Sequence, residues 1–238
     1  LVVQISTLGM QKFRSGIVEW LVKKLAPRSI YEKSLLPSRK EEGLYDEQGA
    51  LYGEVPSQGV EVLENGLKFF VSILHGQKTG FFLDHREMRG QVRSLAHGKR
   101  VLNCFAYTGG FSIYAAQGGA AAVDSVDISA SAMQLAERNM ELNGFSSDAH
   151  HFYAEDVFDF LREKPLDYDL VILDPPAFAK RQKDVVSACR GYKDINRLAM
   201  EKMPAGSILL TSSCSYHVNE ELFQTVVFQA AVEAKRTV

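Results

Sequence analysis

The residues with the clearest chemical potential lie at 206–216, where a short apolar run passes into small hydroxyl residues and one thiol. Residues 207–210 follow a Pro-Ala-Gly sequence, a pattern that is typical of a buried strand beginning after a turn. In an open α/β sheet, ligands bind beyond the carboxyl ends of the strands. The thiol of Cys214 is therefore predicted to face a ligand-binding cleft, and we interpret it as a candidate nucleophile.

A second stretch, at 174–178, reads Asp-Pro-Pro-Ala-Phe and directly follows a very apolar run. Two prolines after a strand end its ladder of hydrogen bonds and hold a rigid, extended turn. Such a turn would present Asp174 accurately to a planar base, and the ring of Phe178 would stack on that base. The alternative is a plain turn that only ends the strand.

Three further positions follow predicted strands. Residues 103–110 form a turn in which Gly109 and Gly110 would let a ligand approach the backbone closely. Asp127 ends the next strand, where a carboxylate usually accepts hydrogen bonds from ribose hydroxyls. Asp156 ends the strand after that and would accept a hydrogen bond from an adenine amino group. For both aspartates, capping of the following helix is the alternative.

A sheet is needed to bring these residues together, and the chain from Arg100 onward predicts one. Strands are expected at 101–105, 121–128, 151–154, 169–173 and 207–210. The helices between and after them are expected at 111–117, 129–143, from 157 to 162, at 192–203 and at 219–235. This alternation predicts a parallel, doubly wound α/β sheet with right-handed crossovers.

The first part of the chain has a different pattern, which predicts a small α+β domain. Residues 9–25 read as an amphipathic helix whose apolar stripe is expected in the core: Met10, Phe13, Ile17, Trp20 and Leu21. Residues 29–36 are expected to form a strand and residues 39–56 a polar loop. Two alternating runs, at 59–63 and 67–74, flank Asn65 and Gly66, which is a strong signal for a β-hairpin.

The domain boundary is expected between the hairpin and a helix that begins near Asp84 and ends near His97. We therefore assign residues 1–75 to the small domain and residues 76–238 to the catalytic domain. The first residue is not Met and no signal-peptide pattern follows it, so we expect a fragment of a longer protein.

The composition is that of an ordinary globular protein, with 46% hydrophobic and 24% charged residues among 238 and a net charge of −2. No apolar run approaches the length needed to span a membrane. The three cysteines form neither a disulfide framework nor a metal-ligand spacing, which favours a reducing cytoplasm and no metal. Cys104 and Cys189 are interpreted as small buried apolar residues.

The strand-end motifs together resemble those of class I S-adenosylmethionine-dependent methyltransferases. The motifs lie at 103–111, 126–127, 155–156, 174–176 and 213–215. Three longer stretches resemble, more narrowly, the bacterial family that makes 5-methylcytosine in large-subunit ribosomal RNA; they lie at 78–86, 188–196 and 211–215. The resemblance covers nearly the whole chain.

This resemblance implies a cofactor, a partner and a set of site residues. The cofactor would be S-adenosylmethionine and the partner RNA, above all large-subunit ribosomal RNA, and a homodimer is left open. The implied cofactor-binding residues are Lys78, Thr79, Arg86, Asn103, Phe105, Ala106, Tyr107, Gly109, Asp127, Asp156 and Asp174. Cys214 and Asp174 would be catalytic, and the residues facing the base would be Pro175, Pro176 and Phe178.

The thiol indicates the class of reaction. Carbon 5 of cytosine is a poor nucleophile, and addition of a thiolate to carbon 6 makes it enamine-like. Ala177 stands where many RNA 5-methylcytosine enzymes carry a second cysteine, so the base that removes the carbon 5 proton is unassigned. The RNA-binding module of the PUA type and the closing antiparallel strands of the family are not expected in this chain.

Three other functions stay open on the sequence alone. A methyltransferase acting on the amino group of a base would use the Asp-Pro-Pro-Ala-Phe stretch and need no cysteine. A dinucleotide-binding oxidoreductase would share the sheet, although the turn at 103–110 lacks the G-x-G-x-x-G pattern. A non-catalytic RNA-binding fragment would keep the fold alone.

Overall fold

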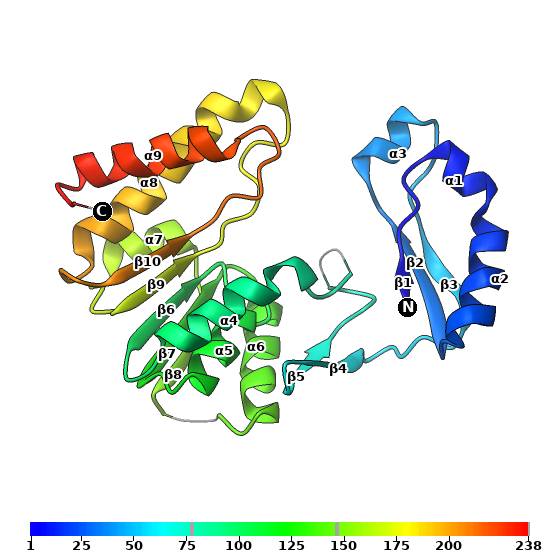
Figure 1. Cartoon of the computed structure of the whole chain (residues 1–238), viewed down its shortest axis with the longest axis horizontal. Helices are drawn as coiled ribbons and strands as arrows, with labels where there is room; N and C mark the ends of the chain where they lie inside the picture. Colours follow the sequence, from blue (N-terminus) through cyan, green and yellow to red (C-terminus); the bar gives the residue numbers. More distant parts are fainter. Residues whose placement is uncertain (77–78, 146–147, 238) are drawn as a thin grey trace. The chain divides into compact units, whose positions relative to one another are not determined.

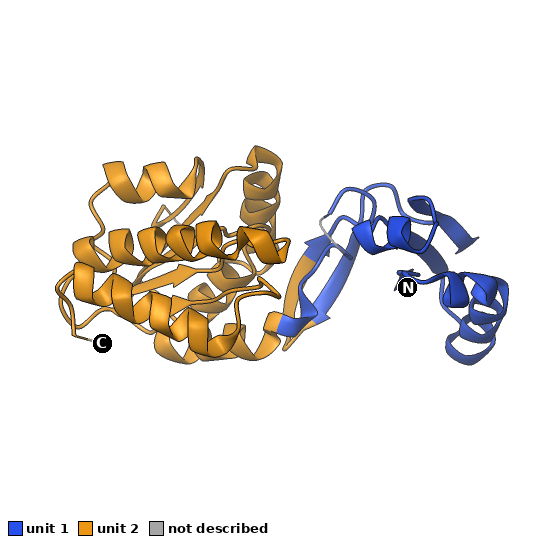
Figure 2. Ribbon diagram, turned by 90° about the horizontal axis from the view of Figure 1, so that it is seen from above, with its two compact units in different colours: residues 1–63, 70–84 blue, residues 64–69, 85–238 orange. Residues whose placement is uncertain are grey.

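The structure is a computed structural model that describes residues 1–76, 79–145 and 148–237 (Figure 1). The chain divides into two compact units (Figure 2). Unit 1 comprises Leu1–Leu63 and Phe70–Asp84, and unit 2 comprises Glu64–Phe69 and His85–Val238. The boundary expected between residues 75 and 76 falls inside the second segment of unit 1, and the division into 1–75 and 76–238 stays a prediction.

Unit 2 is built around a parallel five-stranded sheet of order β10-β9-β6-β7-β8 (Figure 1). The strands are β6 (Arg100–Cys104), β7 (Ala122–Asp127), β8 (His150–Ala154), β9 (Leu170–Leu173) and β10 (Ile208–Thr211). Every residue of β9 is buried, as its wholly apolar sequence predicts for a strand covered on both faces. The predicted doubly wound α/β sheet is confirmed.

Helices cover both faces of this sheet. They are α4 (Arg86–Leu95), α5 (Gly110–Gln117), α6 (Ala130–Leu142), α7 (Val157–Glu163), α8 (Val185–Lys202) and α9 (Glu220–Glu233). Helix α5 packs between α4 and α6, and α8 packs between α7 and α9. Two buried apolar clusters, one including Val92 and Phe111 and the other Phe160 and Ile195, join these helices to the strands. Helix α8 begins at Val185, earlier than the predicted start at residue 192.

Unit 1 contains a three-stranded sheet of order β1-β2-β3. Its strands are β1 (Val2–Val3), β2 (Ser29–Ser34) and β3 (Glu47–Gly53), and its helices are α1 (Leu8–Lys12), α2 (Arg14–Leu25) and α3 (Pro37–Glu41). The prediction of a loop at 39–56 was wrong, because α3 ends and β3 lies within it. Antiparallel pairing with β2 organises β3, and this non-local cause leaves little local pattern in the sequence.

The prediction that the apolar stripe of residues 9–25 lies in the core was also wrong. Met10, Phe13 and Trp20 are 50%, 67% and 57% exposed, and neither α1 nor α2 has a buried residue. The helical run breaks at Phe13, so residues before and after the break do not share one continuous face. The side chains that α2 partly buries include Ile17 and Leu21.

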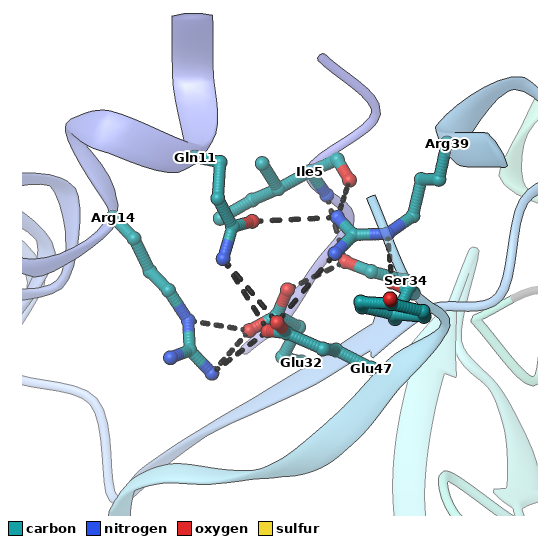
Figure 3. A network of polar contacts seen from close by, with 8 residues as sticks. Ile5, Gln11, Arg14, Glu32, Ser34, Arg39 and Glu47 are labelled. Atoms are coloured by element: carbon teal, nitrogen blue, oxygen red, sulfur yellow. Dashed lines mark hydrogen bonds and ion pairs between the residues drawn. The ribbon is translucent and has the colours of Figure 1, made fainter. Parts of the chain in front are cut away.

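Charged side chains hold the interior of unit 1 together (Figure 3). Arg39 and Glu32 are fully buried. The Arg39 guanidinium donates to two backbone carbonyl oxygens, those of Ile5 and Tyr45. Glu32 accepts hydrogen bonds from Arg14 Nε and from Ser34 Oγ, each at 2.7 Å. Glu47 lies between the two arginines, 3.5 Å from Arg14 and 3.8 Å from Arg39, so opposite charges compensate the buried groups.

The predicted hairpin is confirmed, with β4 (Val60–Glu64) and β5 (Leu67–Val71) as its strands. Asn65 and Gly66 have φ angles of 51° and 82°, the left-handed conformation that this two-residue turn requires. The tip of the hairpin, Glu64–Phe69, belongs to unit 2.

The tip is held in unit 2 by a buried ionic group. Glu64 accepts two hydrogen bonds from Arg89, each at 2.8 Å, and one from the hydroxyl of Tyr114 at 3.0 Å. Asn143 adds a pair of hydrogen bonds to the backbone of Lys68, at 2.8 and 2.7 Å.

Within the described part of the chain, no helix is both long and apolar enough to cross a membrane.

Candidate active site

The strand register brings the candidate residues to one edge of the sheet. Cys104 pairs with Val126 on one side and with Leu173 on the other, and Thr211 also pairs with Leu173. The chain therefore leaves β6, β7, β9 and β10 at the same carboxyl edge, where parallel sheets bind their ligands.

Asp174 is held between two side chains to which the sequence had assigned no role. Its Oδ1 accepts a hydrogen bond from Ser212 Oγ, and its Oδ2 lies 3.2 Å from Nδ1 of His85. The His85 ring lies 5.8 Å from that of Phe111 at the start of α5. Residues 85, 174 and 212 are far apart in the chain, so no local pattern could have joined them. The carboxylate is fixed in direction, as a group that binds a substrate must be.

Cys214 is exposed directly beyond β10, and its Sγ lies 3.6 Å from the carbonyl oxygen of Pro175. The other two cysteines differ from it. Cys104 is fully buried and Cys189 is half-buried, and burial raises the pKa of both thiols. Their environments agree with the interpretation of both as apolar packing residues, because a raised pKa keeps a thiol protonated and unreactive.

Ser215 ties the segment that carries Cys214 to the segment that carries Asp174. The buried Oγ of Ser215 accepts a hydrogen bond from Ala179 N at 3.0 Å and lies 2.8 Å from the hydroxyl of Tyr192 on α8. Tyr192 is fully buried. Two loops from different strand ends are thus joined to one helix through a single serine hydroxyl.

Phe178 lies in an apolar cluster between α8 and the preceding loop. Its ring centroid is 4.6 Å from that of Tyr192 and 6.2 Å from that of Phe158. A Cβ atom at Gly191 would lie 3.2 Å from the Phe178 ring, which shows how closely α8 packs there. Packing accounts for Phe178, and its stacking on a base stays a prediction. Of the two prolines, residue 175 is buried and residue 176 is exposed.

The turn after β6 has an unusual backbone. Phe105 and Tyr107 have positive φ angles of 58° and 48°, a conformation that non-glycine residues seldom adopt outside constrained sites. Gly109, at φ 79°, is needed for packing as well, because a Cβ there would lie 2.9 Å from Cβ of Ala136. Ala106 is buried against the same helix, α6.

Asp127 braces this turn at the end of β7. Its Oδ2 accepts a hydrogen bond from Tyr107 N and its Oδ1 one from Ser129 N, both at 2.9 Å. Ser129, not Asp127, caps α6. Ile128, which had no predicted role, is 74% exposed beside this carboxylate and offers an apolar surface.

Asp156 caps α7, as the alternative interpretation predicted. Its Oδ1 accepts hydrogen bonds from Phe158 N at 2.8 Å and from Asp159 N at 3.2 Å. A capping carboxylate keeps lone pairs for a further donor, so contact with an adenine amino group stays a prediction.

The remaining predicted cofactor residues are Asn103, Arg86, Thr79 and Lys78, and the contacts of the first three are described. Asn103 is fully buried and donates to Ser112 Oγ at 2.9 Å. Arg86 Nε lies 3.5 Å from the carboxylate of Glu64. Thr79 is part of unit 1, where its hydroxyl donates to Phe81 O at 3.3 Å. Lys78 lies outside the described residues. Their roles at a cofactor stay predictions.

These features fit a nucleoside-bearing cofactor such as S-adenosylmethionine. The turn at 105–109 has a constrained backbone at a strand end, Asp127 supplies an oriented carboxylate, and Ile128 supplies an apolar surface for a purine ring. A Rossmann-like sheet with these strand-end groups defines an α/β protein of the nucleotide-binding class.

The comparison with known families agrees with this class. The sequence profile of S-adenosylmethionine-dependent methyltransferases matches residues 45–227, and the chain belongs to this family. The cofactor of the family is S-adenosylmethionine, as the sequence predicted.

Two similar curated proteins are both named ribosomal RNA large subunit methyltransferase I. The one from Shewanella denitrificans is 45% identical over 241 aligned positions, which include 100% of this chain and 61% of the relative. The one from Aeromonas salmonicida is 45% identical over 240 positions, 99% of this chain and 60% of the relative. The chain thus spans about three fifths of the length of these relatives.

Two solved structures share the fold at a TM-score of 0.82 each. A Streptococcus mutans protein described as a SAM-dependent methyltransferase is 28% identical, with 97% of this chain and 59% of that chain covered. The structure of SMU.776 complexed with SAH is 30% identical, with 96% of this chain and 59% of that chain covered.

Proposed function

We propose that this chain carries the activity of a methyltransferase that modifies carbon 5 of a cytosine in large-subunit ribosomal RNA through a covalent cysteine adduct. The names of the two relatives support the RNA substrate. One observation carries the chemistry: Cys214 is the exposed cysteine among the three, and its Sγ lies 3.6 Å from the carbonyl of Pro175 in the Asp-Pro-Pro turn. A ribosomal RNA substrate is consistent with a cytoplasmic protein.

In this proposal, residues at different strand ends bind different parts of the cofactor. S-adenosylmethionine, when bound, supplies an electrophilic methyl group. Asp127 accepts hydrogen bonds from the ribose, Asp156 accepts one from the adenine amino group, and the turn at 105–109 contacts the methionine part. The remaining residues with a proposed cofactor role are Lys78, Thr79, Arg86 and Asn103.

The protein residues would act on the base as follows. The Cys214 thiolate adds to carbon 6, and the electron pair of the 5,6 double bond moves to make carbon 5 nucleophilic. Asp174, oriented by Ser212 and His85, accepts a hydrogen bond from the exocyclic amino group and holds the ring in position. Carbon 5 then takes the methyl group and S-adenosylhomocysteine leaves. A base that is unassigned among these residues takes the carbon 5 proton, and the electron pair of that C–H bond re-forms the 5,6 double bond as the Cys214 thiolate leaves carbon 6.

Replacement of the thiol tests this mechanism. Cys214→Ala should abolish covalent trapping of RNA that contains 5-fluorocytosine and reduce methyl transfer to background, while equilibrium binding of S-adenosylhomocysteine is unchanged. Cys189→Ala is the matched control, because that half-buried thiol has no proposed role. Full carbon 5 methylation by Cys214→Ala would overturn the cysteine mechanism.

A methyltransferase acting on a base amino group is the second candidate. The observation in its favour is the fixed direction of the Asp174 carboxylate. This carboxylate accepts a hydrogen bond from Ser212 and lies 3.2 Å from His85, and neither contact depends on a thiol. Mass spectrometry of digested RNA separates the candidates, because the methyl group would be on the exocyclic nitrogen and not on carbon 5.

A further inference from the structure

A turn next to the candidate nucleophile carries an aromatic ring that is almost wholly in solvent. Tyr216 is 93% exposed, two residues after Cys214. Its ring contacts only the edge of His217 among the described aromatic rings, at 5.3 Å between centroids and 84° between planes. An exposed aromatic ring two residues from the candidate nucleophile offers a flat surface on which a planar group can stack.

Both ends of this turn are anchored. Val218 N donates to the carbonyl of Ser215 at 3.0 Å, which closes a four-residue turn with Tyr216 and His217 at its tip. Ser215 is held by Ala179 and Tyr192, and Val218 is buried in the cluster that contains Tyr192. The backbone that carries Tyr216 is therefore already fixed. Because of this, less conformational entropy is lost when a partner binds to the ring.

The distance to the thiol suits a neighbouring nucleotide. Two trans peptide units separate the Cα atoms of residues 214 and 216 by at most about 7 Å. Successive bases of a strand stack about 3.4 Å apart and lie farther apart when they are splayed. A ring at that distance can stack on the nucleotide next to one whose base lies against Cys214.

Basic side chains follow in the chain after a residue that contacts this turn. Ala179 N donates to Ser215 Oγ, and the exposed residues Lys180, Arg181 and Lys183 come directly after Ala179 in the sequence. Arg181 forms an ion pair with Asp184, with 3.3 Å between Nε and Oδ2, and its side chain is 69% exposed. Cations next to an aromatic ring are the arrangement that binds single-stranded nucleic acid, with phosphates on the cations and a base on the ring.

We propose that Tyr216 is a stacking platform for an unpaired RNA nucleotide next to the target, and that Lys180 and Lys183 bind the phosphates of that strand. This inference rests on the proposed function for the choice of RNA as partner. It assigns a substrate-binding role to a turn for which sequence analysis had none, and it concerns affinity for the strand and not the chemical step.

Fluorescence anisotropy with a short labelled oligouridine containing one central cytosine tests the stacking role. Tyr216→Ala should weaken binding by about 5-fold to 150-fold, the range that loss of one stacked base produces. Tyr216→Phe and Tyr216→Trp should bind within a few-fold of the unsubstituted chain, because both keep a planar ring. Tyr45→Ala, at an exposed tyrosine of similar accessibility (87%), is the matched control and should not change affinity.

The phosphate contacts have their own signature. Lys180→Ala together with Lys183→Ala should reduce the slope of log K against log salt by about 0.7 for each phosphate that is no longer neutralised, whereas Tyr216→Ala should leave that slope unchanged. Unaltered affinity in Tyr216→Ala, equal losses in Tyr216→Ala and Tyr45→Ala, or no RNA binding by the unsubstituted chain would each overturn the proposal.

The trapping assay separates this result from the proposed chemistry. A covalent 5-fluorocytosine adduct with unaltered affinity in Tyr216→Ala would contradict the stacking platform and leave the cysteine mechanism intact. Weakened binding in Tyr216→Ala without any adduct in the unsubstituted chain would support the platform and contradict the cysteine mechanism.

Discussion

The geometry of the candidate site depends on one buried hydroxyl, that of Tyr192. This hydroxyl lies 2.8 Å from Ser215 Oγ, which also accepts a hydrogen bond from Ala179 N. Through this serine the loops after β9 and β10 are held against α8. Cys214 and Tyr216 flank the anchored serine, so the two exposed groups owe their positions to a buried one.

Tyr192→Phe tests this anchor, because it removes the hydroxyl and keeps the ring that packs on Phe178. Loss of one buried hydrogen bond should lower the free energy of unfolding by about 0.5–1.5 kcal/mol. For a chain of this size Tm should fall by about 2–4 °C per kcal/mol. We expect kcat to fall while affinity for S-adenosylhomocysteine is kept; Tyr45→Phe, at an exposed hydroxyl, is the control. An unchanged kcat would mean that the anchor does not position the site.

At the scale of elements, the strands of unit 2 could be predicted because their signal is local. In the parallel sheet, β9 and β10 are short runs of mainly apolar residues, and each of the five predicted strands lies within two residues of the observed one. The segment at 39–56 could not be predicted, because β3 depends on its pairing with β2 and α3 ends beside the buried Arg39. Non-local pairing leaves little local pattern.

Part of the candidate site could be predicted from the sequence and part could not. The positions of Asp127, Asp174 and Cys214 at strand ends follow from the strand pattern, and the structure has them there. The contacts of Asp174 with His85 and of Ser215 with Tyr192 join distant parts of the chain, so they require the folded structure. The exposure of Tyr216 likewise depends on how the turn is anchored.

The hairpin tip should depend on the buried pair of Glu64 and Arg89. Glu64→Gln would leave the guanidinium of Arg89, which is 2% exposed, without its carboxylate. Removal of one partner of a buried pair costs about 3–5 kcal/mol, measured by denaturant unfolding. Burial first, and then the carboxylate of Glu64, raises the pKa of Tyr114, so this pKa should fall in the variant.

Glu87→Gln, at an exposed carboxylate on the same helix as Arg89, is the control for the hairpin tip and should change stability by less than about 0.5 kcal/mol. The double variant Glu64→Gln/Arg89→Met should lose less stability than the sum of the single losses, because no buried charge is then unpaired. Strictly additive losses would contradict a direct pairing of Glu64 with Arg89.

At the scale of the whole molecule, the two units are stabilised in different ways. Unit 2 has apolar clusters on both faces of its sheet, as the apolar strands predict. The interior of unit 1 includes the fully buried Glu32 and Arg39, and its helices keep large apolar side chains exposed. Loss of one of these buried charges is therefore expected to destabilise unit 1.

Arg39→Met should therefore destabilise unit 1 by about 3–5 kcal/mol, because the carbonyls of Ile5 and Tyr45 lose their donor and the carboxylate of Glu47 loses a compensating charge. Hydrogen exchange followed by mass spectrometry should show faster exchange in β2 and β3, and protection in β6 and β9 should be kept. Lys40→Met, at the exposed neighbouring position, should leave the exchange of β2 and β3 unchanged. Equal loss of protection in both sheets would mean that Arg39 stabilises the whole chain, and protection kept in β2 and β3 would mean that the buried charges contribute little.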